Sequence, residues 1–244
     1  MKREKLMSEE FFRRDILYVR DEIQRRLDKL KNDTAGIYIK PWIFIHANAM
    51  NSLQLMLLTY SVGEPIGSIK PLLLPAIEAQ HEYLQCVQTY NSENIDLRDI
   101  DDYVEMLWLI SFAIILKVDE HTWNRLLSLV DIAGTDRLFD ILIATKYTHR
   151  PISKIVHHEK IFATLLEVFT AEKDDGQDIL MKYMKHWYTA MRNVYWHDNH
   201  KGPDGGGFFG YWAIEAAAVC MALSIGHEKL DSMDYFPKDL VVHS

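Results

Sequence analysis

The chain has few of the features that commit a protein to a disulfide framework or to a membrane. It contains 2 cysteines, and both Cys86 and Cys220 fall inside helical patterns rather than loops. Such thiols are typical of reduced, buried side chains, and they favour neither a disulfide nor a catalytic thiol. The most apolar run, Met106 to Leu116, is shorter than the ~20 residues of a membrane span. It predicts a buried core helix.

The first residues do not follow a signal-peptide pattern, and the chain has no surplus of positive charge. Its first residues, MKREKLMSEEFFRRDILY, carry charges every few positions and no apolar stretch of signal-peptide length. We therefore expect a cytoplasmic protein without a membrane partner. Lys and Arg number 27 against 35 Asp and Glu, for a formal net charge of -8. The electrostatic field of an acidic protein repels phosphate groups and attracts basic partners, so direct binding to nucleic acid is not expected.

Apolar residues recur at three- and four-residue steps, and no alternating run of strand length appears. The sequence therefore predicts an all-α fold, a single compact bundle of roughly eight to ten antiparallel-packed helices in two halves. Val118-Asp119-Glu120 is the predicted seam between an N-terminal half, residues 1–118, and a C-terminal half, residues 119–244. The helices are expected near residues 8–31, 41–62, 68–90, 94–118, 120–132, 136–147, 159–171 and 177–195, with a last one entered at Gly210.

Prolines, glycines and caps support several of these boundaries. Ser8 is a good N-cap for the first helix, and Pro41 suits the first turn of the second because its missing amide would be unpaired there. Pro75 is expected to bend the third helix or to delay its start. The triple glycine 205–207 resembles a phosphate loop in composition only, because no lysine follows at Walker spacing and no strand precedes it. We predict a flexible connection there and find no cofactor fingerprint.

The turn around residues 196–200 has two interpretations. His197, Asp198 and His200 could ligate a metal ion together with Glu215, which would favour a metal-dependent hydrolase. His-x-x-His spacing in a loop is weak support, so a hydrogen-bonded corner between two helices is the preferred interpretation. His157-His158-Glu159 could also ligate a metal, but it precedes an apolar segment and is better explained as a helix start.

Glu215 is the most suggestive single acid. It is followed by small residues that would admit close helix contact, and a buried carboxylate needs a hydrogen-bonding or charged partner. A structural anchor is favoured over a catalytic acid, because catalysis would need a second positioned group. The candidate partners are Tyr211, His200, Arg192 and Lys201.

Two groups of acids could form a negative surface. Asp99, Asp102 and Glu105 follow one another at three-residue spacing, which would turn them in a common direction. A second group, Glu172, Asp174, Asp175 and Asp178, precedes the predicted helix at 177–195. Acids are common at helix N-termini, so dipole stabilisation is the competing explanation for both groups. Phe209 and Tyr211, beside the glycines, could be interface anchors or core residues.

The C-terminal region resembles the PoNi-type immunity proteins, which neutralise PoNe DNase toxins delivered between bacteria. The resemblance is carried by three motifs: Trp196-x-Asp198-x-His200-Lys201, then Gly210-Tyr211-Trp212-x-x-Glu215-Ala216-Ala217-Ala218, and finally Tyr235-x-Pro237-x-Asp239-Leu240. Phe236 and Lys238 depart from the expected tail, where a tyrosine would stand on either side of the proline. The motif residues Trp196, Asp198, His200, Gly210, Trp212, Glu215, Pro237 and Asp239 are expected to be structural.

The resemblance and the charge together favour a protein that binds a basic DNase toxin and performs no chemistry itself. On this hypothesis the toxin-binding residues are Asp99, Asp102, Glu105, Asp174, Asp175, Asp178, Phe209 and Tyr211. No metal or cofactor is implied, and a homodimer is compatible with the sequence. The alternatives are the metal-dependent hydrolase and a helical scaffold without an inhibitory role.

Overall fold

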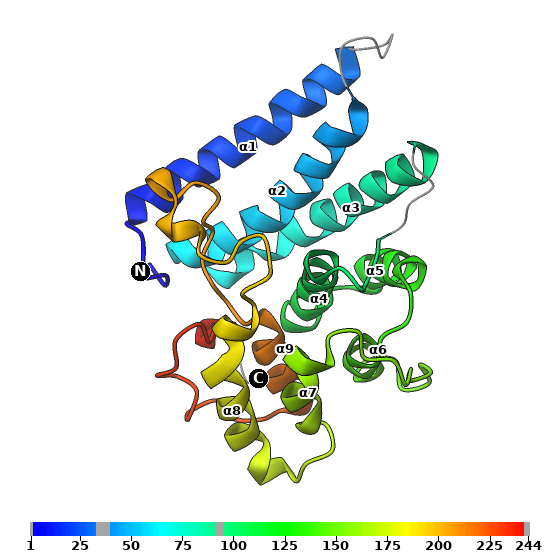
Figure 1. Ribbon diagram of the computed structural model, residues 1–244, viewed down its shortest axis with the longest axis vertical. Coiled ribbons are helices and arrows are strands. Elements are labelled where there is room, and N and C mark those ends of the chain that lie inside the picture. Colours follow the sequence, from blue (N-terminus) through cyan, green and yellow to red (C-terminus); the bar gives the residue numbers. More distant parts are fainter. Residues whose placement is uncertain (1, 33–39, 91–94, 242–244) are drawn as a thin grey trace. The chain divides into compact units, whose positions relative to one another are not determined.

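The computed structural model describes residues 2–32, 40–90 and 95–241 (Figure 1). Over these ranges the chain forms nine α-helices and five short 3-10 helices and no strand, which confirms the all-α class. The α-helices are α1 (Glu9–Asn32), α2 (Pro41–Val62), α3 (Lys70–Tyr90), α4 (Ile100–Ile115), α5 (Glu120–Ala133), α6 (Arg137–Ala144), α7 (Glu159–Glu167), α8 (Gly176–Ala190) and α9 (Ile214–Leu223).

The helices belong to two compact units, each assembled from separate stretches of the chain. The first consists of the described residues of Met1–Ile95, Asn124–Ile132 and Asp198–Gly210. The second consists of those of Asp96–Trp123, Ala133–His197 and Tyr211–Ser244. Both units draw on residues from before and after Val118, and the division of the chain at that residue stays a prediction.

In the first unit α1 packs on α2, and α2 packs on α3 (Figure 1). Pro41 opens α2 as predicted, and Gly63 ends it in a left-handed conformation, φ 94°, whose amide bonds back to the last turn. Pro75 lies inside α3, but the helix already begins at Lys70, so the expected delay of its start is wrong. The apolar stripe of α1 contributes Phe12 and Val19 to the core.

The glycine-rich segment returns to the first unit and packs on α1. The Phe208 ring lies 5.9 Å from that of Phe12, and the Ser61 hydroxyl donates to the Phe209 carbonyl at 2.7 Å. Gly205 is buried with φ +66°, and a Cβ added there would lie 2.5 Å from the Met7 methyl group. The left-handed backbone is what favours glycine here, because the Met7 methyl group ends a flexible side chain that can move aside.

In the second unit α4 packs against α9 and α6, while α7 and α8 form a helical hairpin (Figure 1). Residues from Met106 to Ala113 are all buried in α4, which confirms a core helix within the predicted apolar run. The helix begins at Ile100 after the Asp99 N-cap, later than expected, and Asn94 lies outside the described residues. Cys86 in α3 and Cys220 in α9 are free and buried. Within the described ranges, no helix is both long enough and apolar enough to span a membrane.

Two predicted boundaries in the C-terminal region are wrong. The helix expected to run to Tyr195 ends at Ala190, and turns continue from there to Trp196. The last helix begins at Ile214 rather than at Gly210, whose φ of 100° is left-handed. The Ala213 amide donates instead to the Tyr235 carbonyl at 3.0 Å, so the residues before α9 are held by the C-terminal tail.

Candidate functional site

Glu215, in the first turn of α9, is joined to α8 by two hydrogen bonds. Its side chain is 1% exposed, and its Oε1 accepts from the Tyr183 hydroxyl at 2.6 Å and from the Trp187 indole nitrogen at 2.6 Å. The two donors are four residues apart and therefore lie on one face of α8. They stand beside the buried Leu180 and Met184, so they belong to the apolar face of this helix. The four partners expected from the sequence are wrong.

Burial governs the acid–base behaviour of this group. Desolvation raises the pKa of Glu215 to about 7, and the hydrogen bonds from Tyr183 and Trp187 oppose that rise by stabilising the ionised form. The pKa of Tyr183 is raised well above its usual value by burial and by the neighbouring carboxylate. A carboxyl group held in this way links the first turn of α9 to α8, and the role of Glu215 as a structural anchor stays a prediction.

The same region gathers aromatic side chains from the three motifs. The Trp196 ring stacks on Trp187 at 5.7 Å and on Trp108 at 6.0 Å between centroids, and it lies 5.7 Å from Tyr211. Tyr235, in the tail, lies 5.6 Å from Trp187. The motifs thus converge on one buried cluster, and aromatic packing of this kind contributes about 0.5–1.5 kcal/mol per pair beyond the area buried.

The remaining motif residues hold turns. Gly210 and Pro237 are buried, and Pro237 precedes the short 3-10 helix η5 (Lys238–Leu240). Trp212 is 9% exposed, and its packing role stays a prediction. Asp239, in η5, is exposed, so the tail motif combines a packed proline with a solvent-facing acid.

The structure does not assemble the metal site that was the alternative interpretation of the turn at residues 196–200. Asp198 has a left-handed φ of 65°, and its carboxylate pairs with Lys201 at 2.8 Å. The His197 ring stacks on Tyr188 at 4.3 Å, and the His200 ring lies 5.9 Å from that of Phe208. Among the described residues, no group of three or more His, Cys, Asp or Glu side chains is placed to hold a metal ion.

The first acidic group does not share one exposed face. Asp99 is exposed and caps α4 by accepting from the Asp101 amide at 2.8 Å. Asp102 is half-buried, accepts from the Asp96 amide at 2.9 Å and has a pKa raised by burial. Glu105 is 8% exposed. Steps of three residues fall short of a full helical turn of 3.6, so the side chains rotate progressively around the helix.

The second acidic group is at the surface. Glu172, Asp174 and Asp175 are exposed, and the last two lie in the 3-10 helix η2 (Lys173–Asp175) that leads into α8. Asp178 is also exposed, but its carboxylate pairs with Lys229 at 2.6 Å.

The two candidate aromatic anchors differ from these acids because the structure buries them. Phe209 is 2% exposed and Tyr211 is 1% exposed. As placed, both are core side chains, and neither presents an aromatic surface to a partner.

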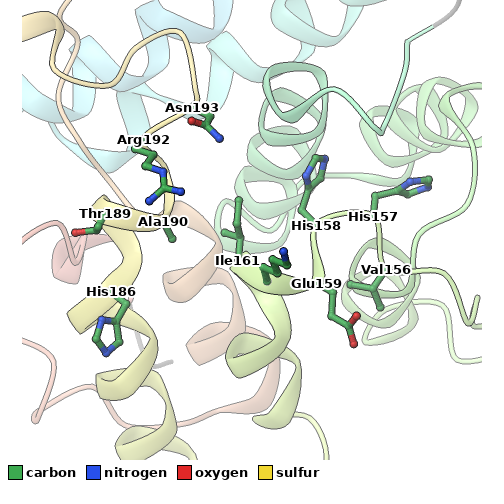
Figure 2. A pocket seen from close by; sticks show the side chains of 11 residues that line it. Val156, His157, His158, Glu159, Ile161, His186, Thr189, Ala190, Arg192 and Asn193 are labelled. Atoms are coloured by element: carbon green, nitrogen blue, oxygen red, sulfur yellow. The ribbon is translucent and has the colours of Figure 1, made fainter.

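An open pocket of about 670 Å³ lies at the end of the α7–α8 hairpin where α7 begins and α8 ends (Figure 2). The sequence did not predict it, because its two walls lie far apart along the chain. His157 and His158 line it but are already engaged, through Nε2, with the carbonyls of Thr135 at 3.2 Å and Leu97 at 2.9 Å. His158 is the N-cap of α7, which confirms the expected helix start.

Comparison with known proteins covers nearly the whole chain. The model for the N-terminal region of the PoNe immunity protein (PoNi) matches residues 3–128, and the model for the C-terminal region of PoNe immunity proteins matches residues 134–240. Together with the all-α fold, these matches define the class of the protein as a toxin-neutralising immunity protein. The chain belongs to the PoNe immunity protein (PoNi) family.

A solved structure shares the fold. It is the crystal structure of protein PA2201 from Pseudomonas aeruginosa, with a TM-score of 0.68 and 18% sequence identity over 93% of this chain and 86% of that one. No curated protein sequence matches this chain. The structural likeness supports the architecture, whereas the class of function rests on the family.

Proposed function

We propose that this immunity protein binds a DNase toxin in the cytoplasm and keeps DNA from the toxin's active or DNA-binding site. Membership of the PoNe immunity family, over both of its regions, is the observation that carries the proposal. Its toxin would be one used in competition between bacteria, as in type VI secretion. The immunity protein itself would perform no chemistry.

The charge of the chain supports this mode of inhibition. A nuclease that grips the phosphate backbone presents Lys and Arg, so a protein of net charge -8 can occupy the same field and exclude the substrate. Protection of a cell from a few toxin molecules requires nanomolar or tighter binding, which corresponds to roughly -12 kcal/mol. Opposite charges also raise the rate of encounter, which matters when an incoming toxin must be caught before it cuts DNA.

The exposed acids are the best candidates for this contact. Asp99, Asp174 and Asp175 are exposed, and Asp99 keeps this exposure while it caps α4. The other three acids are less suited to contact the toxin. Asp102 is half-buried, Glu105 is buried, and the carboxylate of Asp178 is paired with Lys229. We therefore assign the toxin-binding role first to Asp99, Asp174 and Asp175.

Co-production with candidate DNase toxins tests the proposal. Cells that make a toxin of the PoNe type should survive when they also make this chain, and the two proteins should co-purify. Purified chain should prevent cleavage of plasmid DNA by the toxin at a one-to-one ratio. The matched control is an unrelated acidic helical protein of similar net charge, which should not protect. Survival without a complex, or a complex that still cuts DNA, would contradict inhibition by occlusion.

A further inference from the structure

The open end of the α7–α8 hairpin carries two cations in a chain dominated by acids. Lys160 stands in the first turn of α7, and Arg192 follows the end of α8; both are exposed and both line the pocket. Figure 2 shows Arg192 and Asn193 on the α8 side, facing His158 and Ile161 on the α7 side. The two walls are distant in sequence, so only the folded hairpin brings these cations to one pocket.

Neither cation is neutralised by the part of the chain that the structure describes. Lys160 and Arg192 have no ion pair or side-chain hydrogen bond within residues 2–32, 40–90 and 95–241. Most other arginines are paired, as Arg98 is with Asp96 at 2.8 Å and Arg150 with Asp140 at 2.7 Å. Glu159 also lines the pocket, but Figure 2 shows its carboxylate directed away from Arg192.

The segment that leads into the pocket exposes apolar side chains. Ile152 is 45% exposed and Ile155 is 50% exposed, and Val156, the next residue, lines the pocket. The Ile155 carbonyl accepts from the Arg137 amide at 2.7 Å, so this segment is fixed to the start of α6. Exposed apolar side chains close in sequence to the pocket lining can add apolar contact area if a protein partner occupies the pocket.

Resting on the proposed function, we infer that this pocket binds an acidic side chain of the toxin, with Ile152 and Ile155 packing against apolar residues around it. The guanidinium of Arg192 can hold a carboxylate through two parallel hydrogen bonds, and the Lys160 ammonium adds a second charge. The interface would then combine charges of both signs. Acidic residues of the chain would attract the basic toxin, and this pocket would fix its orientation.

Charge reversal within the pocket tests this inference. The probe is the toxin that co-purifies with the wild-type chain, and the variant is Lys160→Glu/Arg192→Glu. The matched control is Lys182→Glu/Lys238→Glu, which makes the same change in net charge at two exposed lysines outside the pocket. The pocket variant should bind the toxin about 100-fold more weakly, while the control should stay within about threefold of wild type. Ile155→Asp should also weaken binding, by about tenfold.

Three results would show that the pocket does not hold the toxin. Unchanged toxin affinity in the pocket variant, with an unchanged thermal midpoint, overturns the inference but leaves the proposed function intact. An equal loss in both double variants also overturns it, because total charge would then be the cause. Titration with inorganic phosphate distinguishes a free-anion site: phosphate binding lost in the pocket variant without loss of toxin affinity overturns the toxin contact. Failure of every toxin to bind the wild-type chain rejects the proposed function itself.

Discussion

The indole nitrogen of Trp187 donates to the Oε1 of Glu215 at 2.6 Å, from the buried face of α8 to the first turn of α9. Trp187 also stacks on Trp196 at 5.7 Å, so the side chain that binds the motif acid also packs on the motif tryptophan. The motif residues Trp196, Tyr211 and Glu215 therefore build part of the interior of the second unit. Toxin contact is assigned to other residues, at the surface, and the two roles can be tested separately.

The first prediction concerns the pH dependence of stability. Burial raises the pKa of Glu215 from 4.5 to about 7 in the folded chain, so between these pH values the folded state binds more protons than the unfolded state. The stability contributed by this group is fully present below about pH 4.5 and is lost as the pH rises to about 7. The change amounts to about 3 kcal/mol.

Glu215→Gln removes this titration and keeps a neutral side chain of similar shape. As the pH falls from about 8 to about 5, the wild-type chain should gain stability relative to the variant. Denaturant unfolding of both proteins across this range measures the difference, and taking a difference cancels the titration of all other groups. Parallel stability profiles would show that Glu215 is not a buried group with a raised pKa.

The second prediction concerns the donors to this carboxyl group. Tyr183→Phe removes one hydrogen bond to Glu215 and should cost about 1.5–3 kcal/mol above pH 7, where the carboxyl group is ionised. In the Glu215→Gln background the same change should cost less, because the bond is no longer made to a charge. A double-mutant cycle measures the coupling. Additive losses would indicate that Tyr183 acts only by packing.

Local patterns were enough to predict most of the helices. Pro41 and Val62 bound α2 as the sequence indicated, because a proline at the start and a glycine after the end restrict the backbone directly. The errors fall where long-range contacts decide. The segment before α9 follows a helical pattern, yet the tail captures the Ala213 amide and delays the helix until Ile214.

The sites were harder to predict for the same reason. The partners of Glu215 could not be chosen from the sequence, because Tyr183 and Trp187 lie 32 and 28 residues away along the chain and only the fold brings them to the carboxylate. The spacing of Tyr183 and Trp187 on one apolar face was the available signal. For the acids at the start of α4 the sequence predicted too much. Their three-residue spacing suggested one shared surface, but three residues are less than a helical turn, and Glu105 is buried.

The third prediction concerns Asp136, the N-cap of α6. Its Oδ1 accepts from the Tyr103 hydroxyl at 2.9 Å and from the Leu138 amide at 2.8 Å, and its Oδ2 accepts from the His157 amide at 3.0 Å. Asp136 is 0% exposed, so Asp136→Ala would leave several buried donors without an acceptor. We expect a loss of about 2–4 kcal/mol, measured by denaturant unfolding.

Asp136→Asn is the matched control for that loss. Asparagine keeps one oxygen for the cap of α6 but turns an amide group toward the His157 amide, so the variant should lose less stability than Asp136→Ala. Equal losses in the two variants would mean that the cap contributes little and that the bond to His157 dominates.

The last prediction concerns the exposed acids and the rate of toxin binding. The variant is Asp99→Ser/Asp174→Lys/Asp175→Lys. Serine at position 99 can still cap α4 but lacks the negative charge of Asp99. We expect association with the toxin to slow by about tenfold at low salt, and by less at high salt, because screening weakens long-range attraction. The matched control is the variant Glu10→Lys/Asp21→Lys/Glu82→Gln, which makes the same total change in charge at other exposed acids. If this control slows association equally, overall charge rather than the named acids steers the toxin; stopped-flow mixing at two salt concentrations distinguishes the two.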